Sequence, residues 1–186
     1  MTDDAAPVDH RPEEILAFWE IARVRAGVVR LVSVTGPDVH GTLVPPTWSF
    51  GDNPALADSL LAAVLDGEKT GTSTALAEFR HGDESLPVRG DLSIIVDSAG
   101  HPAALIRTTA VETVRFDEVD EEFAASEGED DRSLASWRVE HEKYWRRVLE
   151  PLGEQFSPEM PVVTERFELL YPRPSDRGAT ATASAH

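Results

Sequence analysis

The sequence contains no cysteine among its 186 residues. It therefore has no disulfide bond, no thiolate ligand for a metal ion and no cysteine nucleophile. It also lacks an apolar run long enough to cross a membrane, and its N-terminus lacks the pattern of a signal peptide. These absences predict a cytoplasmic protein that makes no contact with a membrane.

Basic residues are scarce, since 17 Lys and Arg face 34 Asp and Glu and give a formal net charge of −17. Non-specific binding to duplex DNA or RNA depends on neutralising phosphates, and this charge argues against it. A small basic pocket is still compatible with the charge, because a local field can differ in sign from the total. Any nucleic-acid partner is therefore expected to be short and single-stranded, or as small as a nucleoside.

The composition is that of a globular protein, with 41% hydrophobic and 27% charged residues. The length suffices for one domain with a full core, which we place over residues 11–172. Residues 1–10 are polar, and residues 173–186 are rich in Ala, Ser and Thr. We expect both terminal segments to be disordered.

Apolar spacing and capping residues predict helices over about 12–27, 54–66 and 133–149, with a short helix inside the acidic segment 117–131. Runs of β-branched residues between breakers predict strands over about 70–79, 90–96, 103–116 and 161–171. Segment 36–48, with its Gly and Pro residues, is expected to be a loop. Helices segregated from antiparallel strands are typical of an α+β domain, and five or six such strands often curl into a small barrel.

The stretch from Leu65 to Ala75 is the main candidate for a functional site. Gly67 is expected to end the preceding helix, because glycine enters the left-handed region without a steric penalty. Lys69 then lies within a few residues of three hydroxyl side chains, those of Thr70, Thr72 and Ser73. Polar groups at such a junction of helix and strand are within reach of a ligand.

Strand alternation decides which of these side chains can meet. In an extended segment 70–76, Thr70, Thr72 and Thr74 share one face, and Gly71 and Ser73 share the other. We expect the long stem of Lys69 to reach back over the Thr72 face. A P-loop is excluded, because Glu68 stands where that motif needs glycine before the lysine.

Three interpretations of Lys69 are open from the residue types. An amine beside the Thr72 hydroxyl forms a pair of nucleophile and base. The ammonium can instead hold a phosphate or an oxyanion as a point charge. The structural alternative is a solvated lysine at a helix end, favoured by the macrodipole and followed by an ordinary Thr-rich strand.

Other residues have similar alternatives. Trp48 and Phe50 can stack on a base or close a helix N-terminus as core residues. Arg107, in the middle of a predicted strand, can reach a phosphate or pair with an acid. Ten Asp or Glu lie across residues 112–131, opposed only by Arg115. This run offers an acidic interaction face but lacks the spacing of a calcium loop.

Five short patterns follow one another along the chain: Gly67-x-Lys69-x-x-Thr72, Asp97-x-x-Gly100-x-Pro102, Ile106-Arg107-Thr108-Thr109, Phe123-Ala124-x-x-Glu127-Gly128 and Ser133-Leu134-x-x-Trp137-Arg138-x-x-His141-x-x-Tyr144. In this order they resemble the ASCH domain family, part of the PUA-like superfamily, over about Phe50 to Tyr171. The resemblance implies a small β-barrel flanked by helices, with a cleft lined by the first pattern.

The resemblance also implies a function directed at RNA or nucleosides. Some small bacterial members are amidohydrolases of N4-acetylcytidine that use a Lys, a Thr and a Glu, and others are linked to RNA cleavage. These three residues correspond to Lys69, Thr72 and Glu127. Thr74 departs from the pattern of the small members, which carry an arginine there.

Hydrolysis and binding make different demands on this site. Hydrolysis needs a base for Thr72, and Lys69 serves only when neutral, which burial favours and a nearby Glu127 opposes. A binding site has no such conflict. The alternatives are a hydrolase of RNA or a modified nucleoside, a non-catalytic reader of RNA or nucleotides, and an acidic protein-interaction domain. No cofactor is expected, apart from a divalent metal for a ribonuclease, and the oligomeric state is not predicted.

Overall fold

A computed structural model describes residues 12–28 and 43–173. The predicted disordered segments therefore lie outside the described residues, apart from Arg173. The α-helices are α1 (Pro12–Arg25), α3 (Pro54–Asp66), α4 (Leu76–Gly82), α5 (Glu121–Ser126) and α6 (Leu134–Leu149). The strands are β1 (Thr47–Trp48), β2 (Gly71–Ala75), β3 (Leu92–Val96), β4 (Pro102–Arg115) and β5 (Pro161–Tyr171). Two 3-10 helices, η2 (Phe116–Glu118) and η3 (Glu150–Leu152), follow β4 and α6.

The five strands form one mixed sheet in the order β1-β3-β4-β5-β2. β1 pairs in parallel with β3, whereas β2 pairs antiparallel with β5, with Ser73 opposite Thr164. The sheet formed by the described strands is not closed into a barrel. Helices together with this sheet confirm the predicted α+β class.

Backbone contacts divide the chain into two compact units. The first comprises Met1–Leu65, Leu92–Ile106 and Leu169–His186, and the second comprises Asp66–Asp91 and Arg107–Glu168. β4 and β5 each contribute residues to both units. The single domain expected over residues 11–172 stays a prediction.

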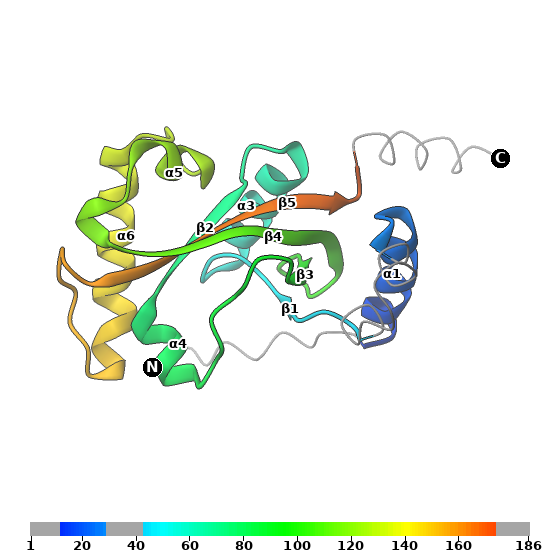
Figure 1. The fold of residues 1–186 in the computed structure, drawn as a ribbon, viewed down its shortest axis with the longest axis horizontal. Helices are drawn as coiled ribbons and strands as arrows, with labels where there is room; N and C mark the ends of the chain where they lie inside the picture. The colour runs from blue at the N-terminus through cyan, green and yellow to red at the C-terminus, as the bar shows by residue number, and fades with distance from the viewer. Residues whose placement is uncertain (1–11, 29–42, 174–186) are drawn as a thin grey trace. The chain divides into compact units, whose positions relative to one another are not determined.

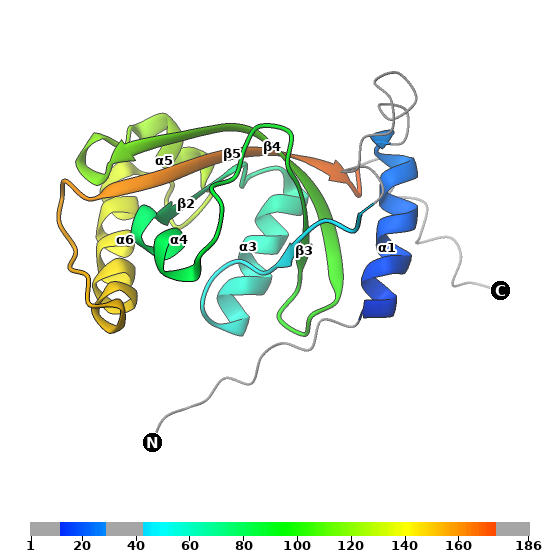
Figure 2. The same ribbon diagram turned by 60° about the horizontal axis from the view of Figure 1, so that its bottom comes forward.

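In the first unit, α1 packs against β3, the start of β4 and the end of β5 (Figure 2). Ile15, Trp19 and Ala22 recur at helical spacing, so one stripe of α1 faces this core. The other buried members are Val28, Ile94, Leu105 and Leu170. α3 begins after Asn53, whose side-chain oxygen accepts the Leu56 N–H at 3.0 Å.

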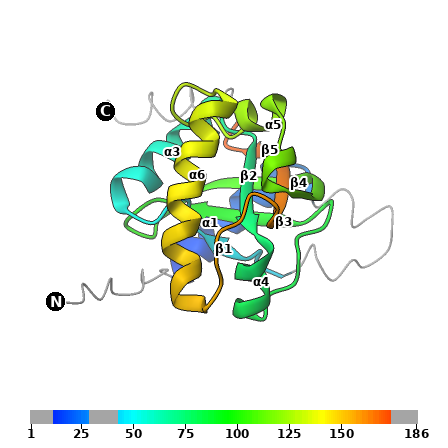
Figure 3. The same ribbon diagram turned by 90° about the vertical axis from the view of Figure 1, so that its left-hand side faces the viewer.

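In the second unit, α5 and α6 pack beside the paired strands β2 and β5 (Figures 1 and 3). Ser133 caps α6 by accepting the Ser136 N–H at 3.1 Å, as the sequence predicts. Trp137 and Trp145 extend from α6 into a core that also contains Ala75 of β2 and Val162 of β5. This core fixes α6 against the face of the sheet on which the candidate site is built.

Two predicted segments are wrong in part. The strand expected over 70–79 ends at Ala75, and Leu76–Gly82 is the helix α4. The Glu78 carboxylate stabilises this change, since it accepts the Ala75 N–H and the Trp145 Nε1–H, each at 3.0 Å. Within the loop expected over 36–48, Thr47–Trp48 forms the short strand β1, and residues 36–42 lie outside the described part.

Candidate functional site

Lys69 is placed by the turn that joins α3 to β2. α3 ends at Asp66, and Gly67 adopts a φ of +77°, so the chain leaves the helix at the predicted glycine. The Thr70 N–H then donates to the Ser126 carbonyl at 2.7 Å, and the Thr70 carbonyl accepts the Phe167 N–H at 2.9 Å. These bonds fix the residue next to Lys69 between α5 and β5.

The Lys69 ammonium is buried, with 1% of the residue exposed. It donates to the Glu127 carbonyl at 3.0 Å and to the Glu129 carboxylate at 2.9 Å, and it lies 3.4 Å from Glu127 Oε2. A buried ammonium is tolerated only where carboxylates and further acceptors compensate for its lost hydration. Lys69 is therefore an internal ion-pair residue and not the solvated lysine of the structural alternative.

Glu127 is held as tightly as its partner. Its Oε1 accepts the Ser73 hydroxyl at 2.6 Å and the Trp137 Nε1–H at 2.7 Å. His141 Nε2 lies 3.5 Å from the same oxygen. These contacts define the Lys69 network, which consists of Lys69, Ser73, Glu127, Glu129, Trp137 and His141.

His141 joins the network through its two ring nitrogens and its ring. Its Nδ1 lies 3.0 Å from the Trp137 carbonyl, and its ring stacks on the Trp137 ring with centroids 4.2 Å apart. The two ring nitrogens thus lie beside two different oxygen atoms, the Trp137 carbonyl and Glu127 Oε1. The ring stacking fixes the direction in which Nε2 points, toward Glu127.

The pKa of Glu127 reflects two opposing effects. Burial has the largest single effect and raises the pKa, because it disfavours the charged form. The charges of Lys69 and His141, with hydrogen bonds from Ser73 and Trp137, together outweigh burial. The net result is a pKa below the ordinary value of 4.5. Glu127 is therefore an anion at neutral pH, and a carboxylate compensated in this way is a weak base.

Gly128 allows the segment after α5 to fold onto the Lys69 backbone. It adopts a φ of +70°, and an added Cβ would lie 2.8 Å from the Glu68 carbonyl oxygen. Arg132 closes the segment with an ion pair to Glu68 at 2.6 Å. Residues 127–132, named here the acidic loop, thus lie against the turn that carries Lys69.

The predicted site residues separate into two groups. Lys69, Ser73 and Glu127 come together in the network. Thr72 does not lie on the side of β2 that carries Ser73, because strand alternation turns it to the other face, opposite Glu165 of β5. The expectation that Lys69 reaches over the Thr72 face is therefore wrong, since its ammonium is bound on the Ser73 side. Thr70 contributes its backbone.

The remaining predicted ligand contacts have structural partners. Arg107 pairs with the exposed Glu168, to which its Nε and Nη2 donate at 2.9 and 2.6 Å. Trp48 and Phe50 belong to the first unit, where their rings meet edge to face at 4.7 Å. Phe50 is buried, with 4% exposed, as expected for a core residue.

Sequence reasoning missed the other three members of the network. Trp137 and His141 were not among the predicted site residues, although their spacing of four residues places both on one face of α6. Their ring nitrogens could have indicated a buried hydrogen-bond partner, because both side chains lie on the apolar stripe of the predicted helix. Glu129 gave no such signal, because it is one carboxylate in a run of acidic residues.

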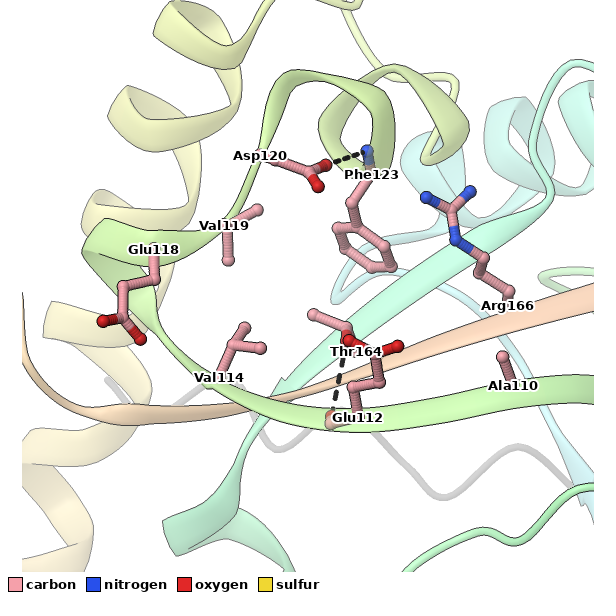
Figure 4. Close-up of a pocket in the computed structure, with 9 residues that line it drawn as sticks. All are labelled: Ala110, Glu112, Val114, Glu118, Val119, Asp120, Phe123, Thr164 and Arg166. Atoms are coloured by element: carbon pink, nitrogen blue, oxygen red, sulfur yellow. Dashed lines mark hydrogen bonds between the residues drawn. The ribbon is translucent and has the colours of Figure 1, made fainter.

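A hollow of about 140 Å³ lies on the same unit, between β4, β5 and the segment leading into α5 (Figure 4). Thr164 and Arg166, in its wall, pair with Ser73 and Gly71 of β2. The carboxylates of Glu112, Glu118 and Asp120 outnumber the single guanidinium in the wall. This charge balance does not suit a phosphate.

Within residues 12–28 and 43–173, no group of three or more His, Asp or Glu side chains is arranged to hold a metal ion. In the same ranges, every helix is too short or too polar to cross a membrane. Lys69 is the positive centre to which the Glu127 and Glu129 carboxylates of the described site are paired.

The sequence pattern of the ASCH domain matches residues 46–171. The chain is also similar to two solved structures. Protein EF3133 from Enterococcus faecalis V583 has 30% identity and a TM-score of 0.70, covering 94% of this chain and 97% of that one. The ASCH domain from Lactobacillus crispatus JV V101 has 28% identity and a TM-score of 0.72, covering 86% of this chain and 96% of that one. No curated protein matches the sequence.

Proposed function

This chain belongs to the ASCH domain family, with its PUA-like fold, and we propose that it binds single-stranded RNA or a nucleotide, with Lys69 contacting an anionic group of the ligand. ASCH domains typically bind RNA. The observation that supports the proposal best is the burial of Lys69, which among the described residues is the one basic residue with a buried side chain. Burying an ammonium costs several kcal/mol of desolvation, so a chain that keeps one needs a specific use for it.

The geometry supports binding better than hydrolysis. A catalytic base must accept a proton, whereas the lowered pKa of Glu127 makes its carboxylate a weak base. The Thr72 hydroxyl faces away from Glu127. Binding, by contrast, needs Lys69 only as a hydrogen-bond donor to a phosphate, and no proton has to move.

The proposal is tested by calorimetry or fluorescence anisotropy with a single-stranded RNA hexamer. Replacing Lys69 by Met should weaken binding at least about tenfold, because one charged hydrogen bond to a phosphate is lost. Lys143→Met is the matched control, since it removes the same charge from an exposed side chain paired with Glu140. It should change affinity less than about twofold, because an exposed charge is screened. Equal affinities of wild type and the Lys69 variant would contradict the proposal.

Lys69→Met leaves the Glu127 carboxylate buried without its main counter-charge, which alone can unfold a protein. The double variant Lys69→Met/Glu127→Gln removes both charges and keeps the side-chain volumes. Binding should be lost in this variant while its circular dichroism spectrum stays that of wild type. Retained binding by a folded double variant would assign the ligand to another surface.

A hydrolase is the second candidate, favoured by the Ser73 hydroxyl 2.6 Å from Glu127 Oε1 with Lys69 on the other carboxylate oxygen. This hypothesis predicts acetate release from N4-acetylcytidine, or cleavage of single-stranded RNA assayed with and without a divalent metal. Ser73→Ala and Thr72→Ala then separate the two hydroxyls, and the reacting one should be essential. The absence of turnover by wild type on both substrates would leave the binding function alone.

A further inference from the structure

The two carboxylates at Lys69 differ in how they are held. Glu127 has 2% of its side chain exposed, and its second oxygen is bound by Ser73 and Trp137. Glu129 has 26% of its side chain exposed and approaches Lys69 Nζ at 2.9 Å. Lys69 itself has only 1% of its side chain exposed, so the partly exposed Glu129 marks the side from which a ligand has to approach it.

The backbone on either side of Glu129 is held in place, whereas its carboxylate is held by the ion pair to Lys69. Gly128 presses against Glu68 on one side, and the Arg132–Glu68 ion pair holds the loop on the other. Displacing the Glu129 carboxylate from Lys69 breaks one ion pair of a partly exposed side chain, and an incoming phosphate replaces the negative charge that Lys69 loses. Displacing Glu127 would break buried hydrogen bonds to Ser73 and Trp137 and is far more costly.

We propose that Glu129 is an internal competitor for the ligand: its carboxylate occupies the place at Lys69 Nζ that a phosphate group of the nucleotide or RNA takes, and the ligand binds by displacing it. The inference rests on the proposed function. It adds that the ligand reaches Lys69 from the Glu129 side and that Glu129 lowers the affinity for the ligand. A carboxylate and a phosphate both present anionic oxygens that accept charge-assisted hydrogen bonds from an ammonium, which makes the exchange chemically matched.

The proposal assigns opposite effects to two residues in contact. Removing Lys69 removes the attraction, whereas removing the Glu129 charge removes both the competitor and a repulsion of the incoming phosphate. Glu129→Gln keeps the size of the side chain and should therefore tighten binding by about tenfold. A purely structural role of Glu129 predicts the reverse, since a loosened Lys69 would bind less well.

Asp130→Asn is the matched control in the same loop. Asp130 makes its contact with the Ser136 hydroxyl, at 3.3 Å, and its φ of 46° is one that asparagine tolerates. Both substitutions change the net charge by the same amount, so a general gain in attraction for RNA appears in both. The gain in affinity of Glu129→Gln beyond that of Asp130→Asn therefore measures the competition at Lys69.

The experiment measures dissociation constants for inorganic phosphate, cytidine 5′-monophosphate and a single-stranded RNA hexamer by calorimetry at low salt. The proposal expects about tenfold tighter binding by Glu129→Gln and less than about twofold by Asp130→Asn. Binding by the Glu129 variant with none detected for wild type supports it as well. Glu129→Ala, with its unfolding temperature measured alongside, repeats the test if the Gln variant does not fold.

Three results overturn the proposal. Unchanged or weaker binding by Glu129→Gln, with wild type binding the hexamer, refutes the competition and leaves the proposed function standing. An equal gain in affinity by Asp130→Asn would show that the Glu129 variant binds more tightly only because the net charge has changed. No binding by wild type or either Glu129 variant refutes the proposed function and this inference together.

Discussion

Gly128 lies directly against the backbone of Glu68, so that a Cβ atom on Gly128 would come 2.8 Å from the Glu68 carbonyl oxygen and 3.0 Å from the Lys69 Cα. Backbone atoms cannot move aside as the end of a flexible side chain can. This close approach brings the two acidic neighbours of Gly128, Glu127 and Glu129, to the Lys69 ammonium. A residue without a side chain is thus what allows the network to assemble.

Gly128→Ala should destabilise the protein by about 3 kcal/mol, because it combines a left-handed backbone with a backbone collision. Gly153→Ala is the control: Gly153 has a similar φ of +74°, and nothing lies within 4 Å of its added Cβ. It should cost only about 1 kcal/mol, the penalty for the backbone conformation alone. Urea unfolding measures the free energy of unfolding of both variants. Equal decreases would show that the protein relieves the collision at Gly128 without a loss of stability.

Trp137→Phe should cost about 2 kcal/mol, because it removes the Nε1–H donor to the buried Glu127 carboxylate. The phenyl ring keeps the stack with Phe116, whose centroid lies 5.3 Å away. Trp145→Phe removes the same atoms and a hydrogen bond to the less buried Glu78, at 3.0 Å. Its cost in urea unfolding should be smaller by about 1 kcal/mol, and a larger cost would place more of the stability at Glu78 than at Glu127.

The lowered pKa of Glu127 predicts how the network responds to acid. A carboxyl whose pKa is lower in the folded than in the unfolded state contributes stability above the unfolded value, ordinarily 4.5. This contribution is lost as the pH falls through the folded pKa. Unfolding free energies from pH 7 to pH 3 should therefore fall more for wild type than for Glu127→Gln. Parallel curves for the two proteins would count against an ionised Glu127.

Glu165 should show the opposite sign. Burial raises its pKa most, the Thr108 hydroxyl at 2.5 Å lowers it, the charge of Asp91 raises it, and the net pKa is raised. A raised carboxyl pKa contributes stability below the unfolded value that is lost as the pH rises toward the folded pKa. Glu165→Gln keeps the shape of the protonated group, so it should raise the urea midpoint at pH 7 and change it little at pH 4. A lower midpoint at pH 7 would mean that the ionised group is the stabilising form.

The helices could be predicted because their signals are local. Ser133 before α6 and Asn53 before α3 act through their own side chains on nearby backbone groups, and Gly67 needs only its own φ. The helix α4 has a weaker local signal, since Ala75 at its N-cap offers no side-chain acceptor and Ala-Leu-Ala after Thr74 fits a strand as well. The helical conformation of this segment also depends on the hydrogen bond between Glu78 and Trp145, which are 67 residues apart in the sequence.

Half of the residues of the candidate site could be predicted from the sequence, but their arrangement only in part. Lys69, Ser73 and Glu127 were identified, but the hydroxyl expected beside Lys69 was that of Thr72. Counting the alternation from Lys69 itself would have placed residues 69, 71 and 73 on one side, which is the arrangement found. Glu129 could not be selected from its acidic neighbours, because its role depends on the left-handed turn at Gly128.

The chain carries only two lysines, Lys69 and Lys143. Since Lys143 has 66% of its side chain exposed and Lys69 only 1%, an acylating reagent added to the native protein should modify Lys143 rapidly and spare Lys69. The slower modification at Lys69 then measures how often its ammonium becomes accessible to the reagent. Because the chain has only two lysines, mass spectrometry can follow the two acylation reactions separately. The rate at Lys69 then reports how often this buried side chain is exposed.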